Sequence, residues 1–216
     1  MTKDELNNVM RSLSLRRPVF HSEADFQHEL AIELVKNGYQ VRLEVPREIT
    51  INGTLVRAEI DLLIHDGKIW IAIELKYVKT ESTIEHCGEV FQLKETWLSN
   101  LSRFDCFADC QRIEAFVDAC YANVGYSVFL TNKADAWEKD ISNKNNLARS
   151  FSIHEGRIIL SNTPLNWYPN DPTEGSVSSK RLPPYSPITL IRERTIEWFD
   201  YSYFESVHQK FKYLIL

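Results

Sequence analysis

Three charged residues lie within the strongly apolar stretch IDLLIHDGKIWIAIELKYVK, which spans residues 60–79. They are Asp61, Glu74 and Lys76. The surrounding residues read as two buried β-strands, and a buried charge is costly unless it is paired with an opposite charge or binds a metal ion. Two carboxylates and an ammonium group at these positions therefore indicate either an ion-pair network or a site for a hard cation.

The Asp-Gly dipeptide at residues 66–67 predicts a two-residue hairpin turn between the two strands. This register pairs Asp61 with Ala72 and Glu59 with Glu74. Side chains alternate between the two faces of a sheet, so the other face is aliphatic. The charged face consists of Glu59, Asp61, Leu63, Trp70, Ala72, Glu74 and Lys76. Asp61 and Glu74 are then diagonal neighbours, about 7 Å apart at the backbone, and their carboxylates could bind one ion.

The alternative is a solvated strand face on which the carboxylates form salt bridges with Lys76, which is a common arrangement that contributes little to stability. Two observations weaken this alternative. Trp70 and Ala72 share the face, and the flanking apolar runs are typical of central strands.

Residues 21–38 are predicted to form a helix, with Ser22 as its N-cap and Gly38 as its C-terminal stop. Glu23 and Gln27 fall near the centre of the apolar arc, which is formed by Phe26, Leu30, Ala31, Leu34 and Val35. If this helix packs on the charged face of the hairpin, Glu23 becomes a third carboxylate there. Otherwise Glu23 complements the helix dipole and Gln27 satisfies a backbone group.

The rest of the chain predicts one α/β domain over residues 1–216, with a core over about 20–140 and a β-rich C-terminal extension over about 150–216. The other expected elements are strands at 39–45 and 47–53, two helices within 84–122 broken near 100–102, a strand at 126–132, a helical turn at 134–139, a strand pair within 150–161, a long loop at 162–187 and strands from 188 onward.

The formal net charge is −5, from 25 Lys+Arg and 30 Asp+Glu. This balance argues against a simple basic nucleic-acid coat, but it allows a local basic groove or bound metal ions that offset carboxylates. The N-terminus lacks an apolar signal core, and no stretch approaches the ~18 apolar residues of a membrane span. No C-x-x-C pair occurs, and a cytoplasmic protein with free, mainly core thiols is expected. The cysteines are Cys87, Cys106, Cys110 and Cys120.

Asp61 followed by Glu74-Leu75-Lys76, after a helix that carries Glu23, resembles the PD-(D/E)xK nuclease superfamily. The resemblance covers residues 23–92, and Ile60 stands where many members have proline, a change that alters no chemistry. It implies a restriction-endonuclease-like fold, in which helices flank a mixed β-sheet, here with additional C-terminal strands.

The resemblance also implies roles for these residues. Asp61 and Glu74 would bind Mg²⁺, which Mn²⁺ could replace, and Glu23 and the carbonyl of Leu75 would be further ligands. Lys76 would assist the attacking water. The alternative for Lys76 is an ion pair with Glu59.

Further residues could support such a site. Gln27, Glu59 and Gln92 are candidate accessory residues, although Gln92 is followed at i+4 by Thr96 rather than by the tyrosine of the Gln-x-x-x-Tyr motif in some RecB-type members. Four cationic residues could contact phosphate groups, although a solvated helix face is the better explanation for each one taken singly. These four are Lys79, Lys94, Arg103 and Arg112.

The expected function is Mg²⁺-dependent hydrolysis of phosphodiester bonds in nucleic acid, with DNA favoured over RNA and no membrane association. A homodimer is left open. The alternative is a catalytically degenerate nuclease fold that serves as a nucleic-acid-binding, protein-binding or regulatory module. The intact set of Glu23, Asp61, Glu74 and Lys76 favours the enzyme, whereas the acidic net charge favours the alternative.

Overall fold

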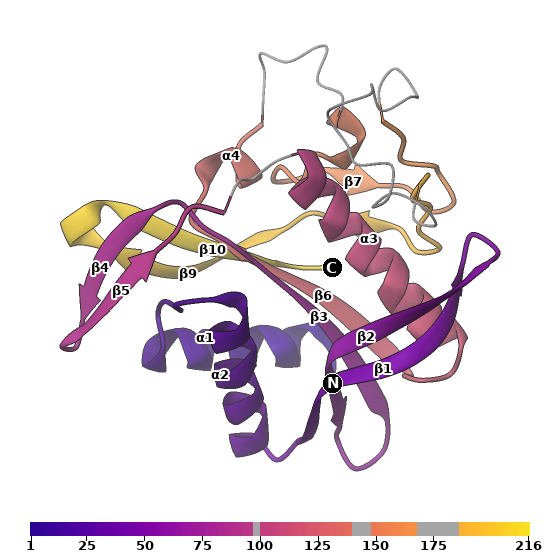
Figure 1. The fold of residues 1–216 in the computed structure, drawn as a ribbon, viewed down its shortest axis with the longest axis horizontal. Helices are drawn as coiled ribbons and strands as arrows, with labels where there is room; N and C mark the ends of the chain where they lie inside the picture. The colour runs from indigo at the N-terminus through magenta and orange to yellow at the C-terminus, as the bar shows by residue number, and fades with distance from the viewer. Residues whose placement is uncertain (97–99, 140–147, 168–185) are drawn as a thin grey trace.

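A computed structural model describes residues 1–96, 100–139, 148–167 and 186–216. Its centre is a six-stranded mixed sheet in the order β1-β2-β3-β6-β10-β9 (Figure 1). The strands are β1 (Gln40–Ile51), β2 (Thr54–His65), β3 (Trp70–Val78), β6 (Val124–Thr131), β9 (Trp198–Phe204) and β10 (Gln209–Ile215). β3 and β6 are parallel, and the other neighbours are antiparallel. The expected α/β class and mixed sheet are therefore confirmed.

Helices cover both faces of this sheet. The structure contains α1 (Lys3–Arg16), α2 (Glu23–Lys36), α3 (Asn100–Asp118), the short α4 (Ala134–Trp137) and two 3₁₀ turns, Arg149–Phe151 and Glu205–Val207. Figure 1 shows α1 and α2 on one side of the sheet and α3 on the other. Two small hairpin sheets complete the described fold. They are β4 (Ser82–His86) with β5 (Glu89–Leu93), and β7 (Ile158–Ile159) with β8 (Arg194–Thr195).

One core lies between α1, α2 and the aliphatic face of the β2–β3 hairpin. Phe26 and Leu30 of α2 pack in the same buried cluster as Leu62, Ile64 and Ile73. Both helices begin with a side-chain cap, since the Thr2 hydroxyl accepts from the N–H of Glu5 and the Ser22 hydroxyl from the N–H of Asp25. The helix predicted at 21–38 is therefore confirmed, whereas α1 was not predicted.

The charged face of the hairpin is covered by α3. Ile113 and Phe116 pack with Leu63 and Ala72 in a second buried cluster. The condition that α2 packs on the charged face is therefore not met. The physical reason is that the unbroken aliphatic face offers α2 the larger apolar area.

The register of the β2–β3 hairpin also differs from the prediction. His65 pairs with Trp70, so residues 66–69 form the connection rather than two residues. The Asp66 carboxylate explains the longer turn, because its Oδ1 accepts from the N–H groups of both Lys68 and Ile69. The register moves by two positions, which leaves each side chain on its expected face.

The first of the two helices expected within residues 84–122 is instead the β4–β5 hairpin. Cys87 and Gly88 at its turn both have positive φ, 51° and 79°, as tight hairpin turns require. Ile84, Phe91 and Leu93 are buried while their neighbours are not, which is the period of two of a strand. Gln92 is therefore on a strand, so its helical spacing to Thr96 has no structural meaning.

Smaller differences concern the remaining elements. Pro46 lies within one continuous β1 at the sheet edge, where its missing N–H costs nothing. In α2, Val35 is 56% exposed, while Glu33 is buried against α1 with hydrogen bonds from Ser12 and Arg16. Of the strand pair expected within residues 150–161, only β7 forms. Most of the loop expected at 162–187 lies outside the described residues.

The C-terminal strands β9 and β10 complete the central sheet rather than a separate layer. Cys106 and Cys110 are buried as expected, Cys87 and Cys120 are exposed, and all four are free. Within the described ranges, no helix combines the length and the apolar character needed to cross a membrane.

Gly125 of β6 sets how closely α3 approaches the sheet. A Cβ at this position would lie 2.6 Å from Cγ2 of Ile113 and 3.0 Å from the carbonyl oxygen of Ala72. We expect Gly125→Ala to lower the free energy of unfolding by about 1–3 kcal/mol, because overpacking forces the backbone to shift. Urea denaturation measures this loss. The loss should shrink in an Ile113→Ala background, and an unchanged urea midpoint would contradict the close approach.

Candidate active site where two strands diverge

The candidate site begins where β2 and β3 separate. The two strands pair only through residues 62–65 and 70–73, although β3 continues to Val78 beside β6. Two carboxylates take the place of the missing strand. Oδ2 of Asp61 accepts from the N–H of Leu75 at 2.7 Å, and Oε2 of Glu23 accepts from the N–H of Tyr77 at 2.8 Å. Buried backbone donors need partners, so these acids complete the hydrogen bonding of the β3 edge.

A cavity of about 160 Å³ lies on the α2 side of this divergence. Its lining consists of Glu23, Ala24, Gln27, Glu44, Asp61 and Leu75. The side-chain amide of Gln27 donates to the Glu44 carboxylate at 2.5 Å and to the backbone carbonyl of Asp61 at 2.9 Å. Gln27 therefore satisfies a backbone group, as the alternative for it proposed, and it also holds a carboxylate at the cavity.

Glu74 lies on the α3 side and is only 1% exposed. Its Oε2 accepts from Nη2 of Arg112 at 2.6 Å, while its Oε1 is buried without a hydrogen-bond partner among the described residues. Nη2 of Arg112 also lies 2.8 Å from Oδ1 of Asp109. Burial, together with the charges of Asp61 and Asp109, raises the pKa of Glu74 well above its ordinary value, although Arg112 opposes the shift.

Asp61 contributes to both sides of the divergence. Burial is the main cause that raises the pKa of Asp61 to about 6, and the charges of Asp109 and Glu44 add to it. The hydrogen bond from the N–H of Leu75 and the charge of Arg112 act in the opposite direction. The carboxylate therefore lies in an environment that lacks sufficient positive charge.

Lys76 forms its ion pair with Glu23, with Nζ 3.7 Å from Oε1. Burial lowers the pKa of Lys76, but Asp109, Glu23 and Asp105 outweigh this effect and raise it overall. Glu59 is exposed on β2. The alternative that paired Lys76 with Glu59 is therefore wrong, since α2 delivers the partner instead.

Three acidic residues at this site were not predicted from the sequence. Asp105 and Asp109 lie on α3 and act on Lys76, and Glu44 lies on β1 with a φ of 50°. The spacing of Asp105, Asp109 and Arg112, at i, i+4 and i+7, places them on one helix face, and this signal was available in the sequence. Glu44 offered no such signal, because it reads as an ordinary polar strand residue.

Glu23, Asp61 and Glu74 were expected to converge on one pocket, but the structure brings them together only two at a time. In the part of the chain that the structure describes, no three His, Cys, Asp or Glu side chains are grouped closely enough to hold one metal ion. Glu23 and Asp61 line the same cavity, and the charges of Asp61 and Glu74 act on one another. The ligand roles of these acids therefore stay predictions.

The other predicted contacts are dispersed. Gln92 and Lys94 are exposed near β5, and Arg103 donates to the backbone carbonyl of Asp135 at 3.1 Å. Lys79 is buried, with its ammonium group 4.8 Å from the centre of the Tyr77 ring. Of the four candidate phosphate contacts, Arg112 alone forms an ion pair with a predicted site residue among those described.

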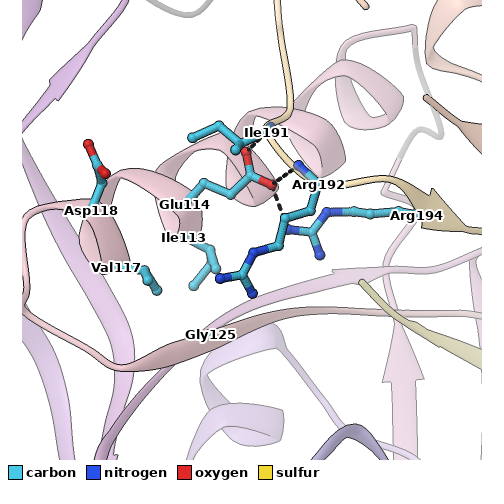
Figure 2. Close-up of a pocket in the computed structure, with 8 residues that line it drawn as sticks. All are labelled: Ile113, Glu114, Val117, Asp118, Gly125, Ile191, Arg192 and Arg194. Carbon is cyan, nitrogen blue, oxygen red and sulfur yellow. Dashed lines mark hydrogen bonds and ion pairs between the residues drawn. The ribbon is translucent and has the colours of Figure 1, made fainter. Parts of the chain in front are cut away.

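A second cavity, of about 240 Å³, lies beside the C-terminal half of α3 and has a structural role (Figure 2). Two acidic residues, Glu114 and Asp118, line it. Glu114 accepts hydrogen bonds from the N–H groups of Ile191 and Arg192, at 2.7 and 3.3 Å, and from Nη2 of Arg194 at 3.0 Å. These contacts hold β8 and the segment before it against α3. The Glu114 carboxylate is thus already satisfied, and the candidate site remains at the strand divergence.

Comparisons with known proteins add no functional information. No family model matches the chain, and no curated protein matches it. A solved structure described as "Crystal structure of SSO0001" is 15% identical and covers 58% of this chain, with a TM-score of 0.23. This chain spans 61% of the length of that structure's chain. A likeness at this level supports no statement about fold or function.

The raised pKa of Asp61 predicts how stability depends on pH. The pKa of Asp61 is about 6 in the folded protein, against an ordinary value of 3.8 that applies to the unfolded chain. The folded protein therefore holds this proton more tightly, and it becomes less stable as pH rises between these two values. Asp61→Asn keeps an acceptor for the N–H of Leu75 and removes this penalty. We expect the variant to unfold at higher urea at about pH 7, with a gain of up to about 3 kcal/mol.

The matched control is Glu48→Gln, which removes an exposed carboxylate from the neighbouring strand β1 and should leave the urea midpoint unchanged. At about pH 4 both variants should resemble the native protein, since Asp61 is then protonated. An Asp61→Asn protein that is less stable than the native chain at neutral pH would show that the carboxylate is already compensated by positive charge.

Proposed function

We propose that this protein is a metal-dependent nuclease of the restriction-endonuclease-like fold that hydrolyses phosphodiester bonds, with DNA as the favoured substrate. The observation that carries this proposal is the buried Oε1 of Glu74, which has no hydrogen-bond partner within the described chain and lies in an acidic environment with Asp61. A buried acceptor without a partner is costly. A cation between these acids would remove that cost.

The donor set suits a hard divalent cation. Mg²⁺ is usually held by one or two carboxylates together with water and substrate phosphates, rather than by a complete protein cage. Asp61 and Glu74 would supply the carboxylates, the carbonyl of Leu75 a third oxygen, and Glu23 a further contact through water. When bound, such an ion supplies Lewis-acid stabilisation of the charge that develops on the scissile phosphate and on the attacking water.

Lys76 would act as a positively charged donor. Its raised pKa keeps the ammonium group protonated at neutral pH, so it cannot accept the proton of the attacking water. The contact with Glu23 restrains its position, and its N–H groups would orient the water or stabilise a phosphate oxygen. The proton of the water then passes to another acceptor, either a site carboxylate or solvent.

The alternative is a degenerate nuclease fold that binds nucleic acid or a protein without cleavage. The pairing of Arg112 with Glu74 favours it, because an internal cation already compensates part of the charge. Intact Asp61, Glu74 and Lys76 favour the enzyme. A cleavage assay separates the two, with plasmid, linear duplex, single-stranded and branched DNA, and RNA, each incubated with Mg²⁺ or Mn²⁺.

Two substitutions test the assigned roles. Asp61→Ala should abolish both the cleavage and the stabilisation by Mg²⁺, which amounts to about 2.7 kcal/mol at a metal concentration of 100 Kd. Lys76→Ala should keep the metal-dependent stabilisation but lower the cleavage rate about 10²–10³-fold, because it removes a transition-state donor. Calorimetric titration and a plasmid-nicking assay measure the two effects, with Glu48→Gln as the control.

If the native protein binds DNA but cleaves no substrate with either ion, the alternative function replaces the nuclease. If Lys76→Ala cleaves at the native rate under saturating metal, the lysine serves only as the ion-pair partner of Glu23.

A further inference from the structure

We infer that Arg112 is a displaceable counter-ion of the proposed metal site. Its guanidinium pairs with both Glu74 and Asp109 in the metal-free protein, and it keeps only the contact with Asp109 when a divalent cation binds. The inference rests on the proposed function and concerns the regulation of that same site. It makes Arg112 a positioning residue that sets how tightly the metal is held.

The contacts of Arg112 already provide both states. One nitrogen, Nη2, lies 2.6 Å from Oε2 of Glu74 and 2.8 Å from Oδ1 of Asp109. Glu74 belongs to β3, whereas Asp109 is on α3 itself, three residues before Arg112. Loss of the Glu74 contact would therefore leave the guanidinium paired with an acid of its own helix. Displacement does not create an isolated buried charge, which would be strongly destabilising.

The pairing with Glu74 is also incomplete. A guanidinium and a carboxylate can form two parallel hydrogen bonds, but here Nη2 reaches Oε2 alone, and Oε1 of Glu74 remains buried without a partner. A one-point contact is weaker and less directional than the two-point form. Glu74 thus keeps an oxygen available for a second positive group while Arg112 is still bound.

The charges around Glu74 favour the exchange. Six carboxylates act on one another or on the nearby cations Lys76 and Arg112. They are Glu23, Glu44, Asp61, Glu74, Asp105 and Asp109. Lys79 acts on Glu23 as well, and the six acids still outnumber these three cations. A divalent cation adds two charges, so the site has enough acids for the ion and the arginine at once, provided that they use different carboxylates.

Arg112 therefore has two opposite effects, one on the stability of the metal-free protein and one on the affinity for the metal ion. Arg112 stabilises the metal-free protein, because without it Glu74 and Asp109 would repel each other in a buried position. Arg112 also weakens metal binding, because the ion must displace it from Glu74, and a competing state lowers the apparent affinity. A purely structural arginine would produce only the first effect.

The test is the Mn²⁺ affinity of Arg112→Gln, measured by calorimetric titration without nucleic acid. The variant should bind Mn²⁺ at least ~10-fold more tightly than the native protein, and it should unfold at lower urea in the absence of metal. Arg103→Ala is the matched control, since Arg103 lies on the same helix but pairs with Asp135. It should bind Mn²⁺ with the native affinity.

Removing a positive charge could also tighten Mn²⁺ binding through a long-range charge effect. Repeating the titration at ~1 M NaCl, where the screening length falls to about 3 Å, distinguishes this effect from direct competition for Glu74. Direct competition for Glu74 predicts that the tighter binding persists there, while a long-range effect predicts that it disappears. Asp109→Asn provides a second variant in case Arg112→Gln does not fold. It removes the alternative partner, so Arg112 stays on Glu74 and Mn²⁺ binds more weakly at both salt concentrations.

Unchanged or weaker Mn²⁺ binding by Arg112→Gln, in a native background that binds the ion, would overturn this inference and leave the proposed nuclease intact. Absence of Mn²⁺ binding by the native protein would overturn both. The same holds for Asp109→Asn: native affinity at high salt would show that Arg112 does not compete with the ion.

Discussion

The separation of β2 from β3 is the constraint on which the candidate site depends. Among the described residues, the edge of β3 beyond Ile73 has no strand partner on this side, yet its backbone donors are not left unsatisfied. Asp61 and Glu23 accept from the N–H groups of Leu75 and Tyr77, respectively. Each acid therefore fulfils a structural requirement with one oxygen, and this contact fixes its position for any chemistry that its other oxygen performs.

The two faces of the sheet then supply the remaining groups in different ways. On the α2 side, the side-chain amide of Gln27 donates to Glu44 and to the backbone carbonyl of Asp61. The cavity there is acidic, and this amide fixes the position of the Glu44 carboxylate. On the α3 side, the guanidinium of Arg112 connects Glu74 to Asp109. Because Asp61 acts electrostatically on both sides, a change in charge at either face alters the pKa of the same carboxylate.

The sequence predicted this arrangement where the periodicity was decisive. The alternating hairpin pattern placed Glu74 on the face opposite the aliphatic residues even though the register was wrong by two positions, since a shift by an even number preserves the faces. The sequence did not show that α3, rather than α2, covers the charged face, because apolar area, rather than the position of Glu23, decides where α2 packs. Residues 84–93 read as helical because apolar runs this short fit either period. Asp109 was overlooked, although its spacing from Arg112 is helical.

The same carboxylates therefore lower the stability of the metal-free protein and are required for the proposed activity. Burial of Asp61 and Glu74 makes their ionised forms unfavourable in the metal-free protein, and Arg112 compensates only one oxygen of Glu74. A fold selected only for stability would replace such acids by neutral residues, because an incompletely paired buried charge contributes no net stabilisation. Their presence on the first residues past the strand divergence is explained if a mobile divalent cation completes the charge balance, because that ion, unlike a fixed side chain, can also approach a phosphate.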